Sequence, residues 1–120
     1  MRAVSGGPGF QRELQSLYYL DNYNLEQMSF MVVVVARQRI LHEALGDRSI
    51  RVCNAEAGLV AQRFYESAAA LDLACGAVLG FNCQKVNELI GVDERDECAV
   101  LCILVAGTRE PPAAFNFDLW

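Results

Sequence analysis

The stretch that decides the fold runs from residue 51 to residue 81 and reads RVCNAEAGLVAQRFYESAAALDLACGAVLGF. Small residues such as Ala57, Gly58 and Ala61 let other backbones approach it closely. Apolar side chains recur at helical spacing along its first two thirds, at Val52, Ala55, Leu59, Val60, Phe64, Ala68 and Leu71. We therefore predict a long central helix enclosed by the rest of the domain, followed by a short apolar strand over residues 75–81.

The segments before this stretch add a strand and a helix. Residues 30–36, FMVVVVA, are apolar and mostly β-branched, which is typical of a strand covered on both faces. Residues 37–45 are predicted to form a helix that ends at Gly46, because glycine is common just past a helix C-terminus. Residues 10–19 fit either a short helix or a strand.

The segments after it complete a sheet. Asn82 is suited to cap a helix over residues 83–90, which Gly91 then ends. The apolar run at residues 98–106, CAVLCILVA, is the best candidate for the middle strand. The sequence therefore predicts an α+β fold with about three buried strands, a long central helix and flanking helices.

The 120 residues are enough for one compact domain. Residues 1–9 form a Gly-rich flexible lead-in, residues 10–107 form the domain, and residues 108–120 form an extended tail. This tail alternates apolar and polar residues and ends in Phe, Leu and Trp, so we expect it to pack on something, for example another subunit.

Composition narrows the classes of partner. The net charge is -5 and the sequence has no basic cluster, which argues against nucleic acids and anionic membranes. No apolar run reaches the roughly 18 residues of a membrane span, and the N-terminus lacks the apolar core of a signal peptide. We expect a cytoplasmic protein. An apolar fraction of 53% hints that some apolar surface contacts another chain.

Residues with catalytic or metal-binding chemistry are few. The five cysteines contain no Cys-x-x-Cys pair, and His42 is the only histidine, so the sequence predicts reduced, buried thiols and no metal site. His42 itself fits an exposed helical position. The carboxylates of residues 93–97 fit a solvated turn better than an acid/base pair. Arg48, Arg51 and Arg63 either meet a phosphate or form surface ion pairs.

The order of segments resembles the C-terminal half of the nitroreductase superfamily, most closely its SagB-type (thiazole/oxazole oxidase) FMN-dependent dehydrogenases. The similarity covers roughly residues 17 to 107. The matching pieces are FMVVVVA, Gly46-Asp47-Arg48-Ser49-Ile50-Arg51, Glu56-Ala57-Gly58 with Gln62, Ala69 and Ala70, then Leu79-Gly80-Phe81, Val86-Asn87-Glu88-Leu89-Ile90-Gly91 and the closing strand to Gly107.

The resemblance implies an oxidoreductase. Members of this superfamily are dimers with FMN at the subunit interface. The SagB-type branch dehydrogenates peptide-derived azolines, and the related cyclodipeptide oxidases act on cyclic dipeptides and contain two different small subunits. The loop matching Leu79 and Gly80 lies near the flavin, where backbone N–H groups can hydrogen-bond the ring and no Cβ blocks its approach. A plain turn at the end of a strand also explains Gly80.

The departures from the family pattern bear on what the chain does. Ala44 and Leu45 occupy the positions of the catalytic Lys-Tyr pair, and neither side chain can take a proton, so we expect no catalytic residue here. The family's N-terminal phosphate-binding stretch has no counterpart in the sequence, and Arg109 is the only basic residue after Gly107.

Three hypotheses follow from these matches and departures. The first is a subunit, inert alone, that completes an FMN-dependent dehydrogenase with a larger, nitroreductase-like, flavin-carrying subunit in a hetero-oligomer. Its substrate would be a small peptide-derived molecule such as a cyclic dipeptide or an azoline. The second is a self-sufficient homodimeric flavoprotein, and the third is a non-catalytic structural remnant. The number of basic residues that could bind the FMN phosphate distinguishes the first hypothesis from the second. This sequence has few such residues, which favours the first.

Overall fold

A computed structural model describes residues 4–20 and 22–107 of the chain. The predicted tail at residues 108–120, with Arg109, lies outside these residues. The elements follow one another as α1 (Phe10–Leu17), η1 (Leu25–Gln27), β1 (Phe30–Ala36), α2 (Gln38–Leu45), η2 (Gly46–Arg48), α3 (Ser49–Ala70), β2 (Leu73–Val78), α4 (Cys83–Ile90) and β3 (Cys98–Gly107). This α+β architecture confirms the predicted fold class, and residues 10–17 take the helical alternative.

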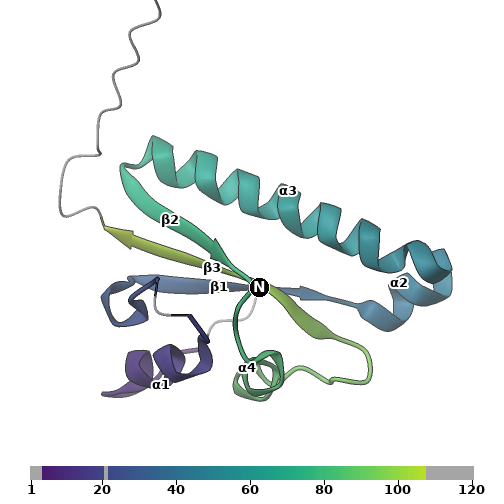
Figure 1. Cartoon of the computed structure of the whole chain (residues 1–120), viewed down its shortest axis with the longest axis horizontal. Helices are drawn as coiled ribbons and strands as arrows, with labels where there is room; N and C mark the ends of the chain where they lie inside the picture. The colour runs from purple at the N-terminus through teal and green to yellow at the C-terminus, as the bar shows by residue number, and fades with distance from the viewer. Residues whose placement is uncertain (1–3, 21, 108–120) are drawn as a thin grey trace, which may run out of the picture.

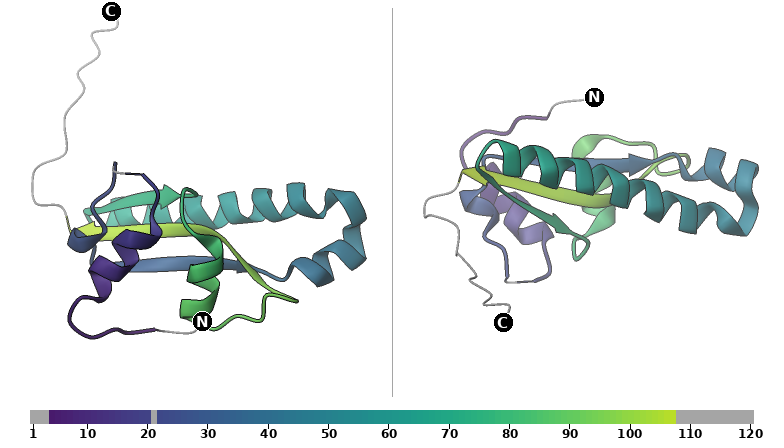
Figure 2. Two further views of the ribbon diagram at one scale, coloured as in Figure 1. Left: turned by 60° about the horizontal axis from the view of Figure 1, so that its bottom comes forward. Right: turned by 90° about the horizontal axis from the view of Figure 1, so that it is seen from above.

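A three-stranded antiparallel sheet forms the middle layer, with the strand order β1-β3-β2. The long helix α3 covers one face, and α1 and α4 cover the other (Figures 1 and 2). The run at residues 98–106 is the middle strand, as predicted. β1 and β2 pair with its two edges, and the helices on both faces of the sheet shield its apolar side chains.

A β-bulge sets which side chains of β3 face which layer. The register with β1 shifts between Val34 and Val35, so that Val34 lies opposite Leu101 and Val35 opposite Ala99. An extra residue breaks the alternation of a strand. Ala99 and Cys102 therefore both join the core under α1 and α4, whereas Leu101 and Ile103 pack under α3.

Residues that the sequence analysis identified as helix ends determine where α4 begins and ends. The Asn82 side chain accepts a hydrogen bond of 3.1 Å from the Lys85 N–H and caps the helix. At the other end Gly91 has a φ of 64°, the left-handed conformation that glycine adopts without strain. Both predictions for residues 83–91 are confirmed.

The predicted strand at residues 75–81 begins and ends earlier than expected. Asp72 takes a φ of 54°, which closes the turn out of α3 at once, so β2 starts at Leu73. The strand stops at Val78, and residues 79–82 form the connection to α4.

The buried face of α3 also differs from the prediction. Ala57, Ala61 and Ala68 face the sheet, because methyl-sized side chains let the helix approach β2 and β3 closely. Leu59, about 200° around the helix from Ala57, is 66% exposed. The central helix is thus covered on one side only, and its outer face is open within the described residues.

None of the helices in the described ranges is both long and apolar enough to cross a membrane.

Candidate functional site

The connection between β2 and α4 carries the two residues predicted to approach a flavin. Leu79 is 74% exposed, and its carbonyl oxygen accepts a hydrogen bond of 3.0 Å from the Phe81 N–H. The Gly80 carbonyl accepts a hydrogen bond of 2.7 Å from the Tyr19 N–H. Both carbonyl oxygens thus already accept one hydrogen bond within the protein.

Gly80 has a packing role besides the predicted one. Its φ is not positive, so the backbone conformation does not require glycine. A Cβ atom at residue 80 would lie 3.3 Å from Leu20 Cδ1 and 3.8 Å from Tyr18 Cε2. The open side of Gly80 therefore faces the end of α1, where only the exposed, flexible Leu20 side chain would have to yield.

The positions of the family's Lys-Tyr pair lie elsewhere. Ala44 and Leu45 are exposed in the last turn of α2. Figure 1 shows α2 at one end of the molecule, whereas the connection from β2 to α4 lies near its middle. The described chain thus does not bring these two predicted parts of a site together.

A cleft between α2 and α3 was not predicted from the sequence. Its volume is about 270 Å³, slightly below the range of roughly 300–1,000 Å³ that is usual for small-molecule pockets. Its lining includes the exposed His42 and the buried Ser49 and Cys53. These residues come from two helices, and no spacing in the sequence indicates that the helices pack together, so the sequence does not predict the cleft.

The three arginines considered for phosphate binding remain available. Within residues 4–20 and 22–107, Arg48, Arg51 and Arg63 have no carboxylate at ion-pair distance. The alternative of surface ion pairs is therefore wrong for them in this part of the chain. Arg48 and Arg51 lie at the start of α3, next to the cleft-lining Ser49.

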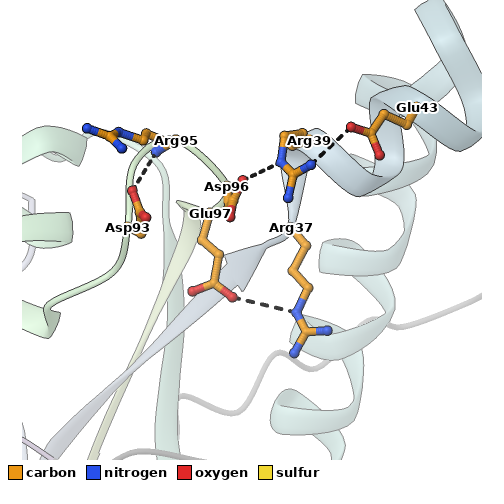
Figure 3. Close-up of polar contacts among 7 residues, drawn as sticks. All are labelled: Arg37, Arg39, Glu43, Asp93, Arg95, Asp96 and Glu97. Carbon is orange, nitrogen blue, oxygen red and sulfur yellow. Dashed lines mark hydrogen bonds and ion pairs between the residues drawn. The ribbon is translucent and has the colours of Figure 1, made fainter.

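Other arginines are occupied by the acidic loop between α4 and β3 (Figure 3). Arg39 contacts Asp96 and also Glu43, at 3.1 Å, and Arg37 lies 3.5 Å from Glu97. Asp96 and Glu43 raise the pKa of Arg39, chiefly through the hydrogen bond that Arg39 donates to Asp96. The acidic residues thus tie a loop to α2 and do not form an acid/base pair.

An Arg39→Ala variant will lose a small, salt-sensitive part of the stability. The ion pairs are exposed, so the melting temperature should fall by only about 2–5 °C in low salt. In about 1 M salt the difference should vanish, because the Debye length shrinks to about 3 Å. Arg63→Ala, which removes an arginine without such a pair, is the control. An equal drop for both variants would contradict the assignment of the loop contacts.

No group of three or more metal-binding side chains gathers anywhere in the described residues. The β2–α4 connection, the α2–α3 cleft, and Arg48, Arg51 and Arg63 are the features of the described residues on which a functional proposal can be based.

Comparison with known proteins identifies the fold's relatives. The model of the nitroreductase family matches residues 5–108. No curated protein sequence matches the chain significantly. A candidate nitroreductase from Anabaena variabilis is 25% identical with a TM-score of 0.74, over 83% of this chain and 20% of its own. One from Ralstonia eutropha is 21% identical with a TM-score of 0.61, over 68% of this chain and 38% of its own. The chain therefore spans well under half the length of these two relatives.

Shorter relatives are covered more fully. A candidate NAD(P)H:FMN oxidoreductase from Staphylococcus epidermidis is 15% identical with a TM-score of 0.57, over 98% of this chain and 70% of its own. At this identity the likeness shows the fold alone.

Proposed function

The chain belongs to the nitroreductase family, and from this membership we propose that it is a subunit of an FMN-dependent oxidoreductase. A larger nitroreductase-like subunit would complete the flavin site. FMN supplies two-electron transfer when bound, and the residues of this chain would hold part of it.

The observation that carries the proposal is a set of partial site elements without an enclosing pocket. Leu79 and Gly80 can present backbone N–H groups to a flat ring, and Arg48 and Arg51, which lie apart from them at the start of α3, can attract an anionic group. The cleft between α2 and α3, at about 270 Å³, is slightly smaller than the pockets that usually hold small molecules. We therefore infer that a flavin would contact this chain only in part and that further polypeptide would supply the remaining contacts.

The outer face of α3 offers a surface for that polypeptide. Leu59 is exposed on this outer face, whereas the exposed Ile50 lies on the other side of α3, next to α2 with its exposed Ile40 and Leu45. Burying such side chains contributes about 1.5–3 kcal/mol each, which favours association.

The proton chemistry would fall to the partner. Neither Ala44 nor Leu45 can abstract a proton, and the only histidine, His42, has no carboxylate partner to orient it among the described contacts. We propose that the substrate is a small peptide-derived molecule, such as a cyclic dipeptide or an azoline. The support for this substrate is the resemblance to SagB-type dehydrogenases and cyclodipeptide oxidases.

A second candidate is a self-sufficient homodimeric flavoprotein. The chain matches 70% of the Staphylococcus epidermidis protein and 70% of a nitroreductase family protein from Streptococcus pneumoniae. Proteins of this fold that are not much longer than this chain therefore exist, which favours the second candidate.

Light scattering after size exclusion tests the assembly. The chain should be expressed alone and together with the nitroreductase-like protein encoded nearest to its gene. The proposal expects one complex that contains both polypeptides. A stable homodimer that carries flavin and ignores the second protein would support the homodimer instead. A chain that carries no flavin and forms no complex with the second protein would support the third hypothesis, a non-catalytic structural remnant.

A further inference from the structure

Two cysteines far apart in the sequence meet where α4 and β3 begin. Cys83 is the first residue of α4 and Cys98 the first of β3, and their Sγ atoms lie 3.1 Å apart. A disulfide bond needs an S–S distance of about 2.05 Å, so the two atoms have to move together by only about 1 Å. The 15-residue separation gives no signal of this pair in the sequence.

Neighbouring groups fix the two sulfurs in place. Both lie near the Ala99 carbonyl oxygen, at 3.2 Å from Cys83 and 3.4 Å from Cys98. The Asn87 side chain, 4% exposed, places its Nδ2 3.7 Å from the Cys83 sulfur and 3.9 Å from the Cys98 sulfur. Its Oδ1 accepts a hydrogen bond of 2.8 Å from the Ala99 N–H, which ties α4 to β3. The contact between the thiols is thus a built feature of the fold.

The pair also differs from the other cysteines. Cys53 and Cys102 are buried, and Cys75 is half-buried on β2. Among the described residues no other two sulfurs are in contact. Cys83 and Cys98 are only half-buried, so a small oxidant can reach them.

We propose that Cys83 and Cys98 are a reversible redox site that a hydroperoxide oxidises to an intramolecular disulfide. A low-molecular-weight dithiol would reduce it again. This site does not depend on the proposed flavin function, and it adds a second redox chemistry to the chain.

The reaction takes two steps. Burial and the neighbouring Cys98 raise the pKa of Cys83 to about 11, which disfavours the Cys83 thiolate as the first nucleophile. The Cys98 sulfur bonds to one peroxide oxygen, the O–O bond breaks, and water or an alcohol leaves with the proton of Cys98. The Cys83 sulfur then attacks the Cys98 sulfenic acid. The S–O bond breaks, and the hydroxyl leaves as water with the proton of Cys83. The two thiols lose two electrons and the peroxide gains them.

The disulfide would close the loop between α4 and β3. It would fix the start of α4, which directly follows the 79–82 connection (Figure 1). Cross-linking this loop restricts the unfolded chain and should raise the melting temperature by about 10 °C.

The test is oxidation of the purified, folded chain with a small excess of hydrogen peroxide. Remaining thiols are then alkylated, and the protein is digested and analysed by mass spectrometry. We expect one cross-linked peptide pair that joins Cys83 to Cys98, three alkylated cysteines, and reversal by dithiothreitol. No cross-link, or a preferred disulfide that involves Cys75, would overturn the proposal.

Three variants sharpen the result. Cys75→Ser should keep the cross-link and the rise in melting temperature, whereas Cys83→Ser and Cys98→Ser should lose both. If a serine variant fails to fold, the wild-type chain is instead oxidised in urea, which tests whether the disulfide requires the folded structure. An unfolded chain should form a random mixture of disulfides, and an equal yield of the 83–98 pair there would show that the fold does not create the site.

Discussion

A Leu59→Asp chain is expected to fold normally and to fail to assemble with the proposed larger subunit. Leu59 is 66% exposed in the middle of the outer face of α3, so an aspartate there stays solvated in the free chain. In the complex the same carboxylate would be buried without a partner, and the lost apolar contact adds to that penalty. We expect the dissociation constant to rise by at least about 100-fold, which corresponds to about 2.7 kcal/mol.

Gln84→Glu is the matched control. It adds the same charge at an exposed position of α4, which lies on the opposite face of the sheet from α3 (Figure 2). This variant should bind like the unmodified chain in a size-exclusion or calorimetric titration. Unchanged assembly of Leu59→Asp would mean that α3 does not face the partner.

An Ile103→Ala variant will lose about 3–5 kcal/mol of the free energy of unfolding. Ile103 is 0% exposed in the middle of β3 and lies under the alanine face of α3. Truncation leaves a cavity that the paired strands on both sides cannot close. Since single domains of this size are stable by only about 5–15 kcal/mol, much of the protein should be close to unfolding at 37 °C.

Ile50→Ala removes the same atoms from a side chain that is 70% exposed. Its free energy of unfolding should change by less than about 0.5 kcal/mol, because the free chain loses no buried contact. Urea titrations of both variants decide the matter. A similar loss for both would contradict the assignment of the core to the face of β3 beneath α3.

Regular local patterns made most of the fold predictable. The apolar runs at residues 30–36 and 98–106 and the cap at Asn82 act within a few residues, so their structural consequence can be read directly. The buried face of α3 was harder to predict, because its alanine-lined face and its leucine-bearing face could each pack on the sheet. The closer approach that Ala57 and Ala61 allow decided it, and that outcome depends on the partner surface of β2 and β3.

The candidate site was predictable only where it lies in one segment. Leu79 and Gly80 are adjacent in the chain, so a resemblance could point to them. The α2–α3 cleft, with His42 and Cys53, depends on how two helices pack, and the thiol pair depends on how α4 meets β3. No spacing rule contains such tertiary contacts.

The measurement that tests the central claim most directly is the visible absorbance of oxidised flavin in three purified samples. These are the chain alone, the chain co-expressed with the nitroreductase-like protein, and that protein alone, each mixed with FMN and desalted. We predict that the chain alone retains no flavin and that the complex retains stoichiometric FMN, more tightly than the larger protein does by itself. Stoichiometric FMN on the chain alone, or no gain in flavin retention when the chain joins the larger protein, would contradict the account.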